Sequence, residues 1–113
     1  MKLVALAAII AAMAVPAAGA ATGKLAGTVG PGFTITLKQG GTKVTTLKAG
    51  TYTITIADKS TIHDFHLTGP GVNKKTAVGT MSTTTWKLTL KKGTYKYVCD
   101  PHASFMHGSF KVT

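Results

Sequence analysis

The only cysteine of this chain lies near its end, among residues whose types and spacing suit metal binding. His102 follows Cys99 by three positions, and Met106 follows His102 by four. A thiolate, an imidazole and a thioether on one short segment form a soft ligand set of sulfur and nitrogen atoms. This set suits copper better than calcium, magnesium or manganese. We therefore predict that the segment holds most of a copper site and needs one more ligand from elsewhere.

The further ligand is predicted at His63, about 36 residues before Cys99. Alternation along residues 61–67 places His63 on the core side of a strand and His66 on the solvent side. A single inward histidine is more often structural than a ligand. The prediction therefore depends on the cysteine loop needing a partner from a neighbouring strand.

A blue-copper site takes two histidines and one cysteine in a trigonal plane, with a weak axial methionine. The chain supplies this set as His63, Cys99, His102 and Met106. His107 is an alternative axial ligand, and its imidazole would bind Cu(II) more strongly and lower the reduction potential. No ligand position is left open for a substrate, which argues against an enzyme. Zinc in the same four ligands is chemically possible.

The scaffold for these ligands is predicted to consist of short, half-buried strands. Large apolar residues alternate with polar ones in several segments, which is typical of strands with one face to a core and one to water. Glycine and proline separate the segments. Seven or eight such strands, with no convincing helical period, predict an all-β sandwich. The clearest segments are residues 33–38, 51–56, 86–90 and 95–99.

A short internal repeat supports this architecture. Residues 47–52 recur as residues 90–95, and in each copy a Gly-x-Tyr pattern begins a strand. The pattern resembles the tyrosine corner of Greek-key sandwiches, in which the hydroxyl satisfies nearby backbone. Two turns built from common turn residues would look alike, so we interpret the repeat as architecture rather than function.

The N-terminus has the organisation of an export signal. A charged start precedes the apolar run Leu3–Val15, and Ala18–Ala20 has the small-x-small pattern of a cleavage site. The run is shorter than the roughly 20 apolar residues of a membrane-spanning helix. We expect residues 1–20 to be a signal peptide and residues 21–113 one exported domain, periplasmic or extracellular, without a transmembrane segment.

Export makes the unpaired cysteine unusual, because small exported domains ordinarily use cysteines in disulfides. A lone cysteine in such a protein indicates an intermolecular bridge or a reactive or metal-bound thiol. A metal ion bound only by the native state would also stabilise a domain of this size.

The composition is strongly basic, with 13 lysines, three aspartates and a formal net charge of +10. Such a field attracts acidic partners or anionic surfaces, although a solvated basic surface is the alternative. Export and the absence of arginine argue against a nucleic-acid partner. We expect redox partner proteins with acidic docking surfaces, whose association slows as salt rises.

The C-terminal pattern resembles the signature of the plastocyanin-like cupredoxins, and His63-Asp64-Phe65 resembles the family's upstream His-Asn motif. The resemblance implies a Greek-key β-sandwich of seven to eight strands, one type 1 copper ion and one-electron transfer between exported or membrane proteins. The matching residues are Lys92-Gly93-Thr94-Tyr95-x-Tyr97-x-Cys99-x-Pro101-His102 and Met106-x-Gly108-x-Phe110-x-Val112.

The chain departs from the family pattern in the loop and on the surface beside it. In the familiar loop the histidine and methionine are five apart, whereas His102 and Met106 are four apart, so His107 takes the family's spacing. Val98 stands where plant-type plastocyanin has a tyrosine. Plant-type plastocyanin docks through an acidic patch, and we do not expect this basic chain to dock in that way.

A third departure is Asp64, which stands where the family usually has an asparagine that braces the cysteine loop. Asp100 follows Cys99, so two carboxylates can approach each other beside the site. We expect one of them to stay protonated or to be held by backbone N–H groups, because close like charges disfavour ionisation of both.

Our leading hypothesis is an exported, monomeric type 1 copper protein that carries one electron at a time. The alternative is a copper carrier or scavenger without an electron-transfer role. Extra methionines and histidines on flexible segments would favour that alternative, and only His66 and His107 are spare. A third hypothesis is a metal-free secreted sandwich in which Cys99 is buried and inert.

Overall fold

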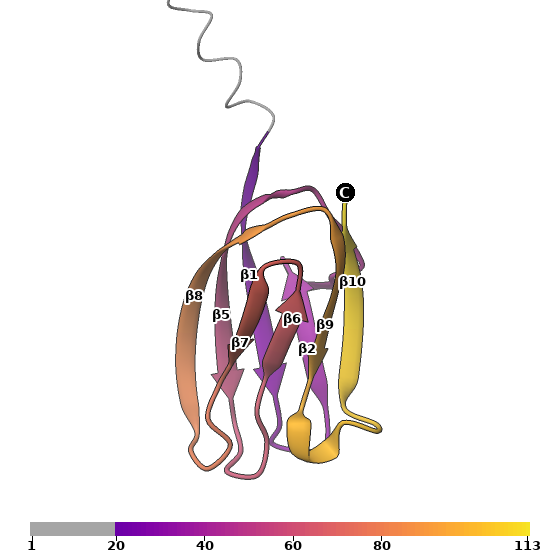
Figure 1. Cartoon of the computed structure of the whole chain (residues 1–113). Helices are drawn as coiled ribbons and strands as arrows, with labels where there is room; N and C mark the ends of the chain where they lie inside the picture. Colours follow the sequence, from indigo (N-terminus) through magenta and orange to yellow (C-terminus); the bar gives the residue numbers. More distant parts are fainter. Residues whose placement is uncertain (1–19) are drawn as a thin grey trace, which may run out of the picture.

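A computed structural model describes residues 20–113, and the predicted signal peptide lies outside these residues except for Ala20. The described chain forms ten strands and one short 3-10 helix (Figure 1). The elements are β1 (Ala21–Val29), β2 (Ile35–Gln39), β3 (Thr42–Lys43), β4 (Thr46–Leu47), β5 (Gly50–Asp58), β6 (His66–Gly69), β7 (Val72–Lys75), β8 (Ser82–Leu90), β9 (Gly93–Val98), η2 (Asp100–His102) and β10 (His107–Val112).

The strands form two mixed sheets that face each other. One sheet has the order β3-β2-β1-β5-β8 and the other the order β4-β10-β9-β6-β7. The chain passes between the sheets after β3, β4, β5, β7 and β8, as in Greek-key sandwiches. The predicted all-β sandwich of seven to eight strands is confirmed, because eight strands have four or more residues and the other two have only two.

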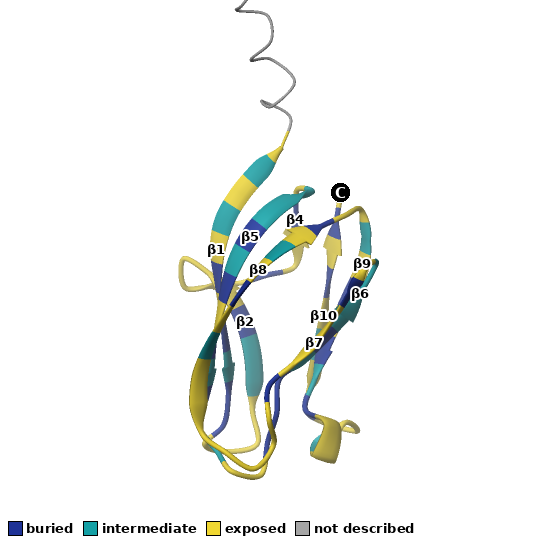
Figure 2. Cartoon of the chain, turned by 60° about the vertical axis from the view of Figure 1, so that its left-hand side comes forward, coloured by how far each residue is buried: buried dark blue, intermediate teal, exposed yellow. Residues whose placement is uncertain are grey.

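Alternating apolar side chains fill the space between the sheets, and Figure 2 shows buried and exposed residues alternating along the strands. The predicted inward residues of β5 and β9 are buried, including Ile54 and Tyr95. Phe33 is an exception, with 57% of its surface exposed. Gly30, at φ 76°, turns the chain after β1, so Phe33 lies in a loop and β2 begins only at Ile35.

The repeated Gly-x-Tyr segments form two tyrosine corners. The Tyr52 hydroxyl donates to the Lys48 carbonyl at 2.7 Å, and the Tyr95 hydroxyl donates to the Lys91 carbonyl at 2.9 Å. Each bond satisfies a backbone acceptor where the chain enters a strand. The architectural interpretation of the repeat is confirmed.

Residues 70–85 are polar and only weakly patterned, which predicts one long connection between the sheets, and this prediction is wrong in part. β7 and the first residues of β8 lie within it, and only residues 76–81 lie between these two strands. Alternation is weak here because β8 begins with Ser82 and the three consecutive threonines at positions 83–85, none of which is buried.

Three connections gather at one end of the sandwich (Figure 1). They are the β1–β2 loop, the β5–β6 loop and the segment from β9 through η2 to β10, and the connection between β7 and β8 lies at the same end. Among residues 20–113, no helix is long and apolar enough to cross a membrane.

Candidate metal centre

Three of the four predicted ligands meet at this end of the sandwich. The Cys99 sulfur lies 3.6 Å from His63 Nδ1 and 3.5 Å from His102 Nδ1, and the two nitrogens lie 3.2 Å apart. We call these three residues the inner cluster. His63 and Cys99 are fully buried and His102 is half-buried. The loops therefore bring together side chains that lie 36 residues apart in the sequence.

The three donor atoms fit one metal ion. The centre of a triangle with sides of 3.2, 3.5 and 3.6 Å lies about 2 Å from each corner, close to the bond lengths of first-row ions to nitrogen and sulfur. The donor set of one thiolate and two imidazoles suits copper or zinc and not the hard cations. The inner cluster is therefore chemically and geometrically suited to a metal.

The β1–β2 loop orients His63. Its Nε2 lies 2.9 Å from the Gly32 carbonyl, which can only accept, so Nε2 carries the proton and Nδ1 keeps its lone pair toward the cluster. The ring of Phe33 stands edge-on to both histidine rings, at 5.4 Å from His63 and 5.1 Å from His102. Sequence reasoning missed both contacts, because it interpreted residues 30–32 only as a turn.

Backbone hydrogen bonds hold the cysteine loop in one shape. The His102 N–H donates to the Cys99 carbonyl at 3.0 Å, and the Met106 N–H donates to the His102 carbonyl at 2.9 Å. The Cys99 N–H in turn donates to the Met106 carbonyl at 3.0 Å. The loop therefore closes on itself, and its ligands are held without a metal.

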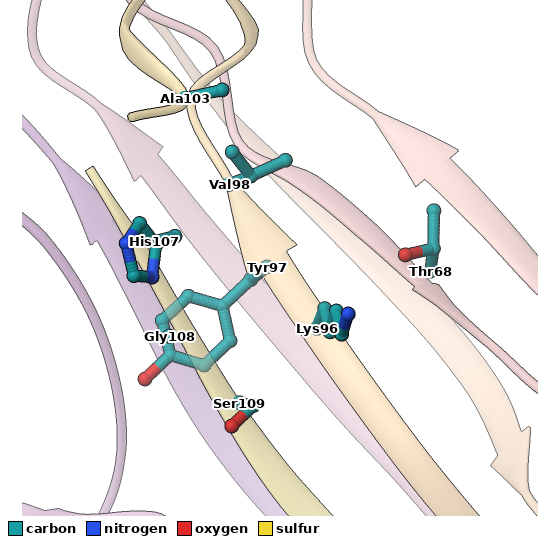
Figure 3. A pocket seen from close by; sticks show the side chains of 8 residues that line it. All are labelled: Thr68, Lys96, Tyr97, Val98, Ala103, His107, Gly108 and Ser109. Carbon is teal, nitrogen blue, oxygen red and sulfur yellow. The ribbon is translucent and has the colours of Figure 1, made fainter. Parts of the chain in front are cut away.

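Met106 and His107 lie on opposite sides of the second sheet. Met106 is 1% exposed, whereas His107 is exposed and pairs in register with Val98. Figure 3 shows His107 at a hollow of about 400 Å³ on the outer face of this sheet, together with Val98 and Lys96. The side-chain alternation of β10 therefore turns His107 away from the core that contains Met106.

Burial raises the pKa of the Cys99 thiol, while hydrogen bonds from the backbone N–H groups of Asp64 and His102 lower it in part. The thiol thus keeps its proton when no cation is present. A bound metal ion reverses this preference, because a coordinating thiol loses its proton outright.

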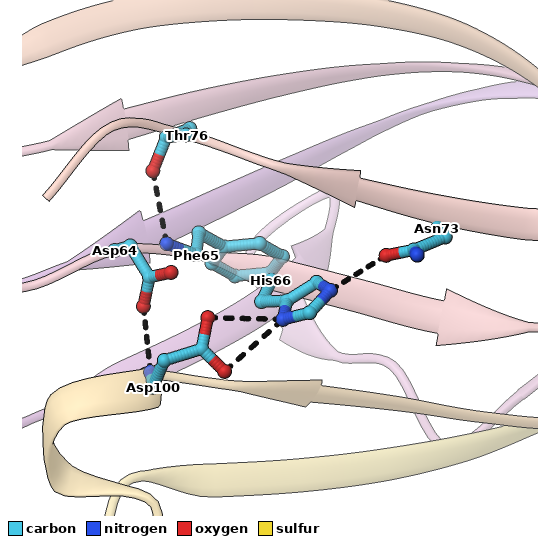
Figure 4. Close-up of polar contacts among 6 residues, drawn as sticks. All are labelled: Asp64, Phe65, His66, Asn73, Thr76 and Asp100. Carbon is cyan, nitrogen blue, oxygen red and sulfur yellow. Dashed lines mark hydrogen bonds and ion pairs between the residues drawn. The ribbon is translucent and has the colours of Figure 1, made fainter.

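A second cluster lies beside the first and is formed by Asp64, His66 and Asp100 (Figure 4); we call it the outer cluster. The Asp100 N–H donates to Asp64 Oδ1 at 2.6 Å. His66 Nδ1 lies 2.9 Å from the Asp100 carboxylate, and His66 Nε2 lies 2.6 Å from Asn73 Oδ1. A backbone N–H thus holds one of the two carboxylates, as expected, and this bond braces the cysteine loop through Asp64, with His66 as a further brace.

Protons in the outer cluster follow from these contacts. Burial, and then the neighbouring Asp100 carboxylate, raise the pKa of Asp64 to about 6. Hydrogen bonds with Asp64 and His66 lower the pKa of Asp100. Burial by itself lowers the pKa of His66, but its hydrogen bonds to Asn73 and Asp100 outweigh burial and raise it. His66 thus favours the charged form, with both ring nitrogens donating.

The model of the cupredoxin-like domain family matches residues 3–112 of this chain. Among solved structures, the copper protein rusticyanin is similar, with a TM-score of 0.62 and 19% identity over 81% of this chain and 78% of that one. Rusticyanin from Thiobacillus ferrooxidans gives a TM-score of 0.54 and 24% identity over 81% and 77% of the two chains. No curated protein matches this chain in sequence. At these identities the structural likeness shows a common fold.

Proposed function

We propose that this chain, which belongs to the cupredoxin-like domain family, holds one type 1 copper ion and acts as a one-electron carrier. His63, Cys99 and His102 would bind the ion in the plane, with Met106 as the axial ligand. The observation that carries the proposal is the triangle of one sulfur and two nitrogens, with sides of 3.2 to 3.6 Å. The Gly32 carbonyl accepts the proton of His63 Nε2, so Nδ1 of His63 faces the triangle with its lone pair.

A copper ion bound here supplies one-electron chemistry by alternating between Cu(II) and Cu(I). The protein contributes a closed, hydrogen-bonded loop and buried ligands, so little rearrangement accompanies the change of charge. His102 is half-buried, and the exposed Phe33 and Phe105 rings lie 5.1 and 5.6 Å from it. We expect electrons to pass between the inner cluster and a redox partner through this edge.

The expected partners are redox proteins with acidic surfaces. Within residues 20–113 the one ion pair joins His66 to Asp100, so no lysine side chain is held in an ion pair with a carboxylate. We further propose that residues 1–20 are a signal peptide and residues 21–113 the exported domain. The start of β1 at Ala21 supports this boundary.

A scavenger role has less support. It would need spare ligands on flexible segments, but His66 is bonded at both ring nitrogens within the outer cluster. Of the two spare histidines, His66 and His107, only His107 could therefore act as a further copper ligand.

Addition of Cu(II) to the protein, followed by its visible spectrum, tests the proposal. We expect an intense blue thiolate charge-transfer band that Cys99→Ser abolishes. Stopped-flow electron exchange with a small redox reagent then separates a carrier, which reacts rapidly and reversibly, from a scavenger. A colourless protein would contradict the type 1 site, and a blue protein that exchanges electrons only sluggishly would contradict the carrier.

The axial ligand is tested with two neighbouring substitutions. Met106→Gln should shift the blue band and lower the reduction potential, because a harder ligand favours Cu(II). His107→Gln should leave both unchanged. The opposite pattern would assign the axial position to His107.

A further inference from the structure

The free edges of β2 and β10 face each other beside the metal loop. β3 pairs only with Lys38 and Gln39 at the far end of β2, and β4 pairs only with Lys111 and Val112 at the far end of β10. Between β2 and β10 lies a cavity of about 190 Å³, which extends as far as the Lys38–Lys43 pair of β2 and β3. We call it the seam cavity. It is lined by Ile35, Thr36, Lys38, Lys43, Tyr97 and His107.

Tyr97 lines this cavity and is only 1% exposed. Burial raises the pKa of its hydroxyl, and among residues 20–113 no hydrogen bond to this hydroxyl acts beside burial. Its ring crosses β10 at Gly108, where a Cβ would overlap the ring and the hydroxyl (Figure 3). Leaving a buried polar group unpaired costs about 1–3 kcal/mol, so this hydroxyl indicates a ligand that the protein itself does not supply.

Two lysines beside the cavity are also unbalanced. Lys38 and Lys43 are direct cross-strand partners in the β2–β3 hairpin, and like charges in that position destabilise a sheet. The cavity lining contains no carboxylate. Asp58 is buried beside Thr76, and Asp64 and Asp100 belong to the outer cluster, so no aspartate offsets the pair.

We propose that the seam cavity binds a small tetrahedral oxyanion, such as sulfate or phosphate. The Tyr97 hydroxyl, the Lys38 and Lys43 ammonium groups, the Thr36 hydroxyl and the His107 ring surround it from three strands and the adjoining hairpin. All five side chains can donate hydrogen bonds, and two of them carry permanent charge at neutral pH.

The size of the cavity agrees with this ligand. The cavity volume of about 190 Å³ is below the roughly 300–1,000 Å³ of pockets that hold drug-sized ligands. This accommodates one four-oxygen anion with bridging water and is too small for a nucleotide or a sugar chain. A charged oxyanion would satisfy the hydroxyl and neutralise the lysine pair at the same time. The inference does not depend on copper, because none of the lining residues belongs to the inner cluster.

The test is a titration of the protein with sodium sulfate, with sodium chloride at matched ionic strength as the reference, followed by amide and side-chain NMR shifts. We expect saturable shifts at Tyr97, His107 and the Lys38–Lys43 hairpin with sulfate and not with chloride. Shifts that do not saturate, or that chloride reproduces, would overturn the proposal. So would tighter binding of acetate, which would make the site a carboxylate site.

Three variants locate the binding. Lys43→Gln should weaken sulfate binding tenfold or more, and Tyr97→Phe about three- to tenfold, from the typical strength of charged and neutral hydrogen bonds. Lys24→Gln removes the same charge from β1, outside the cavity, and should change binding less than twofold. Equal weakening by the two lysine variants would show a general charge effect and overturn the site.

Tyr97→Phe also distinguishes a ligand-binding hydroxyl from a structural one. Without sulfate the variant should melt at the same temperature as the wild type or higher, because its hydroxyl has no protein partner to lose. Sulfate should then stabilise the wild type more than the variant. A variant that is less stable than the wild type in chloride alone would contradict the assignment.

Discussion

Two clusters of polar side chains lie side by side at the metal-loop end of the sandwich, and both consist of residues from the same two segments. The inner cluster has His63, Cys99 and His102, and the outer cluster has the alternating neighbours Asp64, His66 and Asp100. In each cluster the potential ligand atoms lie within 4.8 Å of one another. The spacing of the potential ligand atoms therefore does not separate the two clusters.

Hydrogen bonding separates them. In the inner cluster the bond from His63 Nε2 to the Gly32 carbonyl leaves the lone pair of Nδ1 on the side that faces the other ligands. In the outer cluster both nitrogens of His66 meet acceptors, and Asp64 accepts the backbone N–H of Asp100. A metal in the outer cluster would have to break these bonds. The inner cluster is therefore the better suited of the two to bind a metal, as proposed, and the outer cluster is better suited to brace the cysteine loop.

The largest expected effect is stabilisation by copper. At free copper a thousand times its dissociation constant, binding to the native state alone adds about 4 kcal/mol to the free energy of unfolding. Thermal unfolding should show this gain for the wild type and for Asp100→Asn, and should not show it for Cys99→Ala. A gain that survives Cys99→Ala but not Asp100→Asn would assign the ion to the outer cluster.

The next effect is a pH dependence from Asp64. Its pKa of about 6 in the native state exceeds the ordinary value, so between pH 4 and pH 6 the native state binds a proton that the unfolded chain has lost. The associated stability is present below about pH 4 and is lost as pH rises through 6, by up to about 3 kcal/mol. Urea unfolding of the copper-free protein should show this decline, and Asp64→Asn should flatten it.

Removing the acceptor for the Asp100 N–H should lower the free energy of unfolding by somewhat less than this pH effect. Asp64→Ala leaves this N–H unpaired, and we expect a loss of about 1–3 kcal/mol in the free energy of unfolding. Asp64→Asn keeps a carbonyl oxygen in place and should lose less than half as much. Equal losses in denaturant titrations would show that the hydrogen bond contributes little.

The smallest effect belongs to His66. Its partner Asp100 has a 45% exposed side chain, and exposed ion pairs contribute about 1 kcal/mol or less. His66→Gln should therefore lower the free energy of unfolding by at most this amount at pH 6. The raised pKa of His66 means that its contribution is present below its ordinary pKa and fades at higher pH. An effect that grows toward pH 9 would contradict the brace.

The strand pattern and the meeting of His63, Cys99 and His102 could be predicted from the sequence, because they depend on alternation and residue type. The alternation of apolar and polar residues correctly predicted that Cys99 is buried. The need for a further ligand pointed to His63, which lies beside Cys99 in the structure. The Gly32 carbonyl and the Phe33 ring could not be found this way, because a backbone acceptor has no residue signature and the loop lies 31 residues from His63. Asn73 was missed because the polar β7 was interpreted as part of a connection.

The most direct test of the central claim compares two histidines that are three residues apart, one in each cluster. His63→Gln and His66→Gln are each titrated with Cu(II) while the visible spectrum is recorded. The account predicts that His66→Gln binds one equivalent with an unchanged blue band and that His63→Gln loses the band. A blue His63→Gln protein, or loss of the band in folded His66→Gln, would contradict it.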